Sequence, residues 1–179
     1  MSSALADLLE KGRALLTARW TDAANAAYPF AATGLIRSSR DPFVNPTGVR
    51  GQAAAEALLT AILAPAWDSE PLRMPLEEFI RARAVQDMPP ADAVGVVFCY
   101  KQIIREYLSL ENIFIDWEMR RHIAVLEERV DIAALLAFTL YVQCRENLFT
   151  ARLEDMRRRH NQFLRLAKKY GKASSEENK

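Results

Sequence analysis

ADAVGVVFCYKQIIREYL, residues Ala91–Leu108, is the stretch that decides the fold class, because its first half fits either a strand or a helix. Every residue from Ala93 to Tyr100 is apolar or glycine, and a run such as Val-Gly-Val-Val-Phe is typical of a buried strand. Two observations favour a helix: the pair Pro89-Pro90 is a natural helix start, and no turn residue separates Tyr100 from KQIIREYL. We therefore predict a central helix that is buried on most faces.

The remaining chain also has helical periodicity, and no sustained strand pattern occurs in it. From about Ile115 to Gly171 the pattern is helical, with room for a break near residues 122–131, and DIAALLAFTLYVQC predicts a second central helix. One expected helix runs from a Ser2 or Ser3 cap to Trp20, and another over residues 22–32. A third has its apolar stripe over residues 54–63 and is closed by Pro65, and a fourth covers residues 75–86 with Pro75 in the first turn. The predicted fold class is all-α.

Composition indicates one soluble domain without a dominant charge. The 179 residues include 24 basic and 23 acidic side chains, and half are hydrophobic, so a sizeable core is available and the overall charge favours no particular partner. Cys99 and Cys144 lie in apolar runs, which is typical of free thiols in a reducing compartment. Asp7 and Glu10 stand where a signal peptide needs apolar residues, and the apolar run Ile132–Tyr141 is too short for a membrane span. We expect a cytoplasmic protein.

The loop DPFVNPTG has a structural interpretation. Asn45 is a favoured N-cap and Pro46 a favoured first helical residue, while Val44 and Val49 have the spacing of a hydrophobic staple. Asp41 with the following proline is a turn signal, and Phe43 is expected to anchor the loop in the core. We interpret this segment as a helix start rather than a ligand site.

No motif in the sequence predicts catalysis, a cofactor or a metal site. Glycine-rich phosphate loops, Cys-x-x-Cys pairs and a serine elbow are all missing, and His122 and His160 are expected on polar helix faces. One polar cluster stands out, formed by Arg81, Arg83, Gln86 and Asp87. We interpret it as a network that caps helix ends, with Asp87 serving the next helix start; the alternative is the polar edge of a ligand pocket.

A hydrophobic seam runs along the last predicted helix. It is formed by residues at intervals of seven with one leucine beside them: Val142, Phe149, Leu153, Met156, Phe163 and Tyr170. Seven basic and no acidic residues occur from Met156 to Lys172. The seam predicts pairing with a partner helix, most simply in a homodimer. The alternative is a basic amphipathic helix on an anionic membrane or a nucleic acid, but a surface-lying helix needs a wider stripe at period 3.6.

Three segments together are similar to one known family, the N-terminal domain of RsbRD-type RsbT co-antagonist proteins. They are DPFVNPTG, RARAVQDMPPADAVGVVFCYKQIIREYL and LEERVDIAALLAFTLYVQCRENLF, in order within residues 5–155. The resemblance implies a globin-like helical sensor domain without haem that dimerises and takes part in cytoplasmic stress signalling. In such proteins a phosphorylatable STAS module usually follows; none follows here, so we expect signalling by binding.

These observations lead to an expected organisation and function. We predict a globin-like domain over residues 1–155, a protruding basic helical extension over 156–172 and a disordered tail over 173–179. The preferred function is a non-catalytic regulatory or sensory module, a homodimer acting on an unidentified protein partner in a stress- or redox-responsive pathway. The alternatives are a carrier or sensor with a pocket for a small apolar ligand among the central helices, and a membrane or nucleic-acid adaptor.

Overall fold

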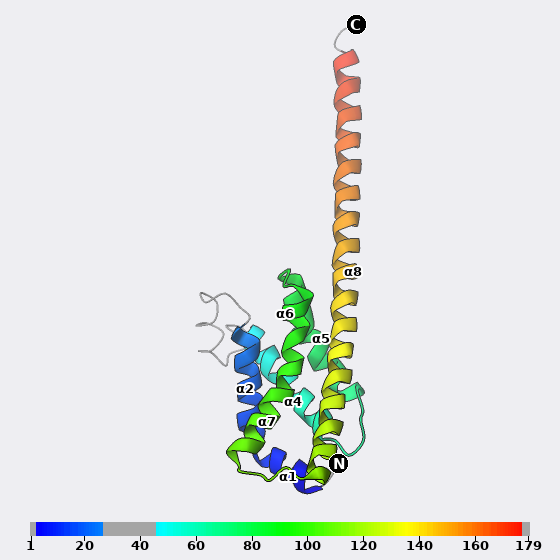
Figure 1. The fold of residues 1–179 in the computed structure, drawn as a ribbon. Helices are drawn as coiled ribbons and strands as arrows, with labels where there is room; N and C mark the ends of the chain where they lie inside the picture. Colours follow the sequence, from blue (N-terminus) through cyan, green and yellow to red (C-terminus); the bar gives the residue numbers. More distant parts are fainter. Residues whose placement is uncertain (1–2, 27–45, 177–179) are drawn as a thin grey trace. The chain divides into compact units, whose positions relative to one another are not determined.

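The computed structural model describes residues 3–26 and 46–176, with side chains for residues 4–26 and 47–165. The chain divides into two compact units, Met1–Val142 and Gln143–Lys179. The elements in chain order are α1 (Ser3–Lys11), α2 (Arg13–Ala26), α4 (Pro46–Leu63), α5 (Glu70–Val85), α6 (Pro90–Gly95), the 3₁₀ turn η1 (Val96–Phe98), α7 (Cys99–Leu110) and α8 (Trp117–Glu176) (Figure 1). Within the described ranges there is no strand, which confirms the all-α fold class.

The decisive stretch is helical throughout, as predicted. It forms α6, tightens into η1, and continues as α7, and the backbone of Gly95 and Cys99 on either side of η1 stays in the helical region. Ala93, Val97 and Tyr100 are fully buried, while Phe98 points partly to solvent. The helix is therefore central, with one exposed aromatic residue on its outer side.

The first predicted helix is interrupted at Gly12 and forms two helices, α1 and α2. A Cβ atom at this position would clash with the ring of Tyr107 on α7, so glycine fits this close approach. Leu5, Leu9 and Leu16 are still fully buried, so both helices keep the apolar stripe on the core side.

The helix α5 begins earlier than predicted. Its N-cap is Ser69 and its first turn contains Pro71, whereas Pro75, the expected first-turn proline, lies inside the helix. Because proline has no N–H, Pro75 forgoes one helical hydrogen bond, and the burial of Leu72 and Leu76 offsets that loss.

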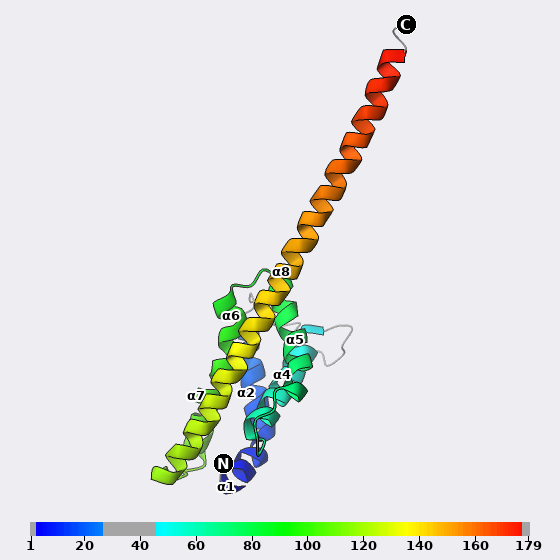
Figure 2. The same cartoon turned by 90° about the vertical axis from the view of Figure 1, so that its right-hand side faces the viewer.

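The core of the first unit is centred on Trp20 of α2. Its ring lies 5.2 Å from that of Phe79 on α5 and 5.7 Å from that of Tyr100 on α7, between centroids. The Tyr100 hydroxyl donates a 2.7 Å hydrogen bond to the carbonyl of Ala55 on α4. The helices α4 and α5 lie side by side, and α4 also packs on α2 (Figures 1 and 2).

The helix α8 runs without the interruption allowed for near residues 122–131. Its N-cap is Asp116, whose Oδ1 accepts a 2.7 Å hydrogen bond from the backbone N–H of Met119. The prediction that DIAALLAFTLYVQC is buried on most faces is wrong. Ala133 and Ala137 face the core of the first unit, but Leu135 and Phe138 are exposed.

Several predictions concern residues at the edge of the described ranges or beyond them. Asp41, Phe43 and Asn45 lie outside the described residues, as does most of the helix expected over 22–32, which is described as far as Ala26. The helix α4 begins at Pro46 and ends two residues before Pro65, as the sequence predicts. Among the described residues, no helix combines the length and apolarity that a bilayer crossing requires.

Candidate functional site

The predicted seam lies on an exposed face of α8. In the second unit the exposed fractions are 64% for Phe149, 59% for Met156 and 69% for Phe163. Leu153 beside them is half-buried, and the side chain of Tyr170 is outside the described residues. A line of large apolar side chains this exposed is not part of the core of the described chain.

An open hollow occurs on α8 in the second unit. Its lining consists of Leu153, Met156, Arg157, His160 and Asn161. Nearby charged residues are paired along the helix itself. Arg158 Nη2 lies 3.3 Å from Glu154 Oε2, and Arg159 Nη2 lies 2.8 Å from Asp155 Oδ2. These ion pairs neutralise part of the basic run.

Exposed apolar residues continue on the part of α8 that belongs to the first unit. We call Val125, Ile132, Leu135 and Phe138 the upstream face. Leu135, with 67% of its surface exposed, lies seven residues before Val142. The seven-residue spacing of the seam therefore extends to Leu135. This extension was not predicted from the sequence, because the whole apolar run suits a buried helix.

Arg129 attaches α8 to the C-terminal end of α4. Its side chain is almost fully buried, and Nη1 donates hydrogen bonds to the carbonyls of Ile62 (2.7 Å) and Ala64 (2.5 Å), while Nη2 reaches that of Pro65 (3.3 Å). The last carbonyls of a helix lack partners within the helix and carry partial negative charge, so a guanidinium both caps and complements them.

A second attachment of α8 lies at Tyr141. Its buried hydroxyl donates a 2.7 Å hydrogen bond to the carbonyl of Met88, in the link between α5 and α6. Two ion pairs, Lys101–Asp131 at 2.5 Å and Arg105–Glu127 at 2.6 Å, also join α7 to α8. The roles of Arg129 and Tyr141 were not predicted, since both residues occur within helical patterns that suit ordinary surface or core positions.

The structure separates the members of the predicted polar cluster. Arg83 is fully buried; it donates to the carbonyls of Ala24 and Asp92, and its guanidinium lies 4.4 Å from the ring centroid of Phe79. Arg81 is exposed and pairs with Glu77 at 2.5 Å on the surface of α5. Arg83 therefore joins α2, α5 and α6. The ion pair between Arg81 and Glu77 lies outside that network.

Gln86 and Asp87 form the exposed end of α5. Gln86 is the C-cap, and Asp87 has a left-handed backbone with φ 56°. The N–H groups of Asp87 and Met88 bind the carbonyls of Ala84 and Arg83, each at 3.2 Å, which is the pattern of a Schellman motif. The N-cap of α6 is Pro89. The role of Asp87 shown by this geometry is to end α5.

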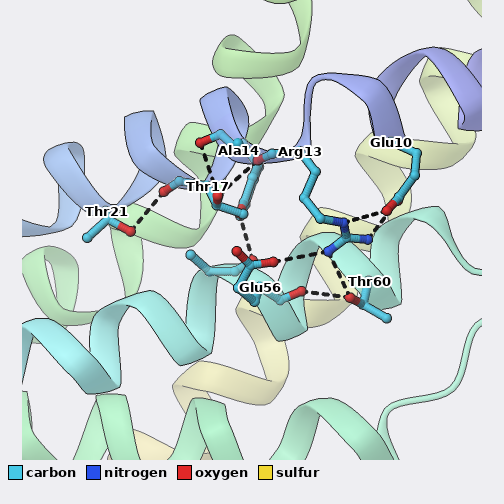
Figure 3. A network of polar contacts seen from close by, with 9 residues as sticks. Glu10, Arg13, Ala14, Thr17, Thr21, Glu56 and Thr60 are labelled. Carbon is cyan, nitrogen blue, oxygen red and sulfur yellow. Dashed lines mark hydrogen bonds and ion pairs between the residues drawn. The ribbon is translucent and has the colours of Figure 1, made fainter. Parts of the chain in front are cut away.

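Arg13 joins the N-terminal helices to α4. Its guanidinium donates to both carboxylate oxygens of Glu10, at 2.6 and 2.7 Å, and Nη1 reaches Glu56 and Thr60 on α4 at 3.2 and 3.1 Å (Figure 3). The hydrogen bond from Arg13 lowers the pKa of the Glu10 carboxyl. This cluster is partly solvent-exposed, so we interpret it as a structural clasp of modest strength.

The cysteines and histidines of the described residues lie apart from one another along the chain. Cys99 and Cys144 are free and half-buried rather than fully buried, and burial raises the pKa of the Cys99 thiol while the charge of Arg83 opposes that shift. His160 is exposed, and His122 Nε2 lies 3.6 Å from Glu118 Oε1, one helical turn away. In the described part of the chain no three His, Cys, Asp or Glu side chains converge as metal ligands.

Comparisons with known proteins give one result. A family model, described as the RsbT co-antagonist protein rsbRD N-terminal domain, matches residues 14–156. The match covers most of the chain and includes all three segments on which the resemblance was based. Searches of curated proteins and of solved structures returned no match.

Proposed function

Because the chain belongs to the family of the RsbT co-antagonist protein rsbRD N-terminal domain, which is associated with the regulation of stress signalling, we propose that it is a non-catalytic regulatory module. In this proposal it pairs with a second copy through α8 and passes its state to a protein partner. The family resemblance also implies a globin-like arrangement of the helices.

One observation carries the proposal: the large apolar residues of the seam are exposed at intervals of seven along a continuous helix. Burying one such side chain stabilises a complex by about 1.5–3 kcal/mol. Phe149, Met156 and Phe163 from two copies would together contribute roughly 9 kcal/mol at the lower value. Association itself costs an estimated 4–15 kcal/mol, so the seam supports a dimer that forms and dissociates at moderate concentration.

The attachments of α8 in the first unit support a route for signal transmission. Arg129 holds α8 to the end of α4, and Tyr141 holds it to the link between α5 and α6. A ligand or partner that shifts α4 or α5 by a small amount would therefore displace α8 as well, since packed helices move as bodies. The proposed output of the module is a change in the pairing of α8.

The pairing can be tested by replacing Phe149, Met156 and Phe163 together with glutamine. Wild-type protein should have the mass of a dimer in light scattering after gel filtration, and the triple variant that of a monomer. Met74 on α5 offers a matched control, because it is 71% exposed and is not on α8, so Met74→Gln should remain a dimer. A wild type that is monomeric at every concentration tested would contradict the proposal.

A further inference from the structure

The proposed pairing places two ionisable residues inside the seam. If Val142, Phe149, Met156 and Phe163 are the d positions of a heptad repeat, the a positions three residues earlier are Thr139, Glu146, Leu153 and His160. Polar residues at a positions reduce the stability of a coiled coil and fix its register. Leu153 is thus flanked on both sides by an ionisable layer.

The hollow on α8 matches the geometry of this repeat. Leu153, Met156, Arg157 and His160 occupy an a, d, e and the following a position, which together form the hole that receives one side chain of a facing helix. In a parallel, in-register pair the side chain that enters is Met156 of the second copy. Methionine is unbranched and adapts to an irregular hole. A second copy of α8 is therefore the occupant that this surface fits.

His160 forms one wall of the hole, and the charged groups around it are mainly basic. Arg157 shares the hole. Arg159 directly precedes His160 and borders the seam, and its guanidinium lies 2.8 Å from the carboxylate of Asp155. In the facing copy the same residues lie opposite His160. No described acidic side chain lines the hole, so a proton on His160 adds positive charge to a site that already contains arginine.

We propose that His160 makes the pairing of α8 sensitive to pH. Histidine is the side chain that changes charge between about pH 8 and about pH 5. In the parallel pair, His160 faces His160 of the second copy, so protonation brings two like charges into one layer of the seam. Acidification therefore weakens the dimer. The inference rests on the proposed function, because it concerns the same seam, and it gives that seam a regulating signal.

The test compares dimer dissociation constants of the full chain by sedimentation equilibrium at about pH 8 and about pH 5.5, at constant ionic strength. For wild type we expect the dissociation constant to rise about five- to tenfold on acidification, as like charges meet at a solvent-accessible seam. For His160→Gln, which cannot titrate, we expect less than about a twofold change. The chain contains only two histidines, so His122→Gln is the matched control and should behave as wild type.

The outcomes separate this inference from the proposed function. A dimer that is equally tight at both pH values, or tighter in acid, overturns the role of His160 and leaves the pairing intact. Retention of the full pH response in His160→Gln, or its loss in His122→Gln, also overturns that role. A wild type that is monomeric at both pH values refutes the pairing itself. Circular dichroism at each pH establishes that the helices remain folded.

Discussion

Replacing Arg129 by methionine tests whether polar contacts at the end of α4 hold α8 in place. The substitution places an apolar side chain of similar length in the site. It removes three hydrogen bonds to the carbonyls of Ile62, Ala64 and Pro65. We expect α8 to loosen in the first unit and the free energy of unfolding to fall.

The expected magnitude follows from the geometry. Each hydrogen bond from a charged donor contributes about 1.5–3 kcal/mol, so the two bonds of 2.7 and 2.5 Å give about 3 kcal/mol at the lower value. The bond to Pro65 is 3.3 Å long and adds little. Burying the guanidinium opposes these contributions, because a charge loses hydration on burial, and we expect a net loss of about 2 kcal/mol.

Urea unfolding followed by circular dichroism measures this loss. Arg81→Met is the control, since Arg81 is exposed and a surface ion pair such as that with Glu77 contributes little to stability. This variant should change the free energy of unfolding by less than about 0.5 kcal/mol. Arg129→Lys should lie between wild type and methionine, because an ammonium cannot reproduce the fork of the guanidinium. If Arg129→Met is as stable as the control, the desolvation of the charge cancels its hydrogen bonds and apolar packing alone holds α8.

Two further predictions concern single contacts. Tyr141→Phe should lower the free energy of unfolding by about 1 kcal/mol, because the buried carbonyl of Met88 loses its donor; an unchanged urea midpoint would exclude that attachment. Gly12→Ala and Gly95→Ala should have opposite effects in thermal unfolding. The first should cost at least about 1 kcal/mol through the clash with Tyr107. The second should gain about 0.5–1 kcal/mol, since nothing lies within 4 Å of the added Cβ and the backbone is helical. The same sign for both alanines would refute the reasoning.

Local sequence signals predicted the helices well but missed two of the helix ends. Helical periodicity and the Pro89-Pro90 start identified the stretch that forms α6 and α7, since those signals lie within a few residues of one another. The break at Gly12 depends instead on Tyr107, which is distant in sequence and close only in the folded chain. Asp87 was predicted to serve the start of the following helix, and the end that its left-handed backbone gives to the preceding helix was not predicted.

The exposed apolar face of α8 was predicted only in part. The interval of seven revealed the seam from Val142 onward, because no competing core pattern is present there. Upstream, the same interval is hidden inside a run that is apolar on most faces. Arg129 was missed for a related reason: a lone arginine in a helical pattern suits an exposed face, and only the folded chain brings the carbonyls of α4 to it.

The apolar run of α8 divides into an inner and an outer face, which hydrophobicity alone does not distinguish. Ala133, Ala137 and Leu140 face the core of the first unit, whereas Leu135 and Phe138 face outward. The two alanines let neighbouring helices approach closely, because the distance between packed helices depends on the side chains at the contact. Leu135 and Phe138 gain nothing from that packing, so the energy of burying them is available to a partner. The upstream face is therefore open to a second helix, which is the role proposed for the seam.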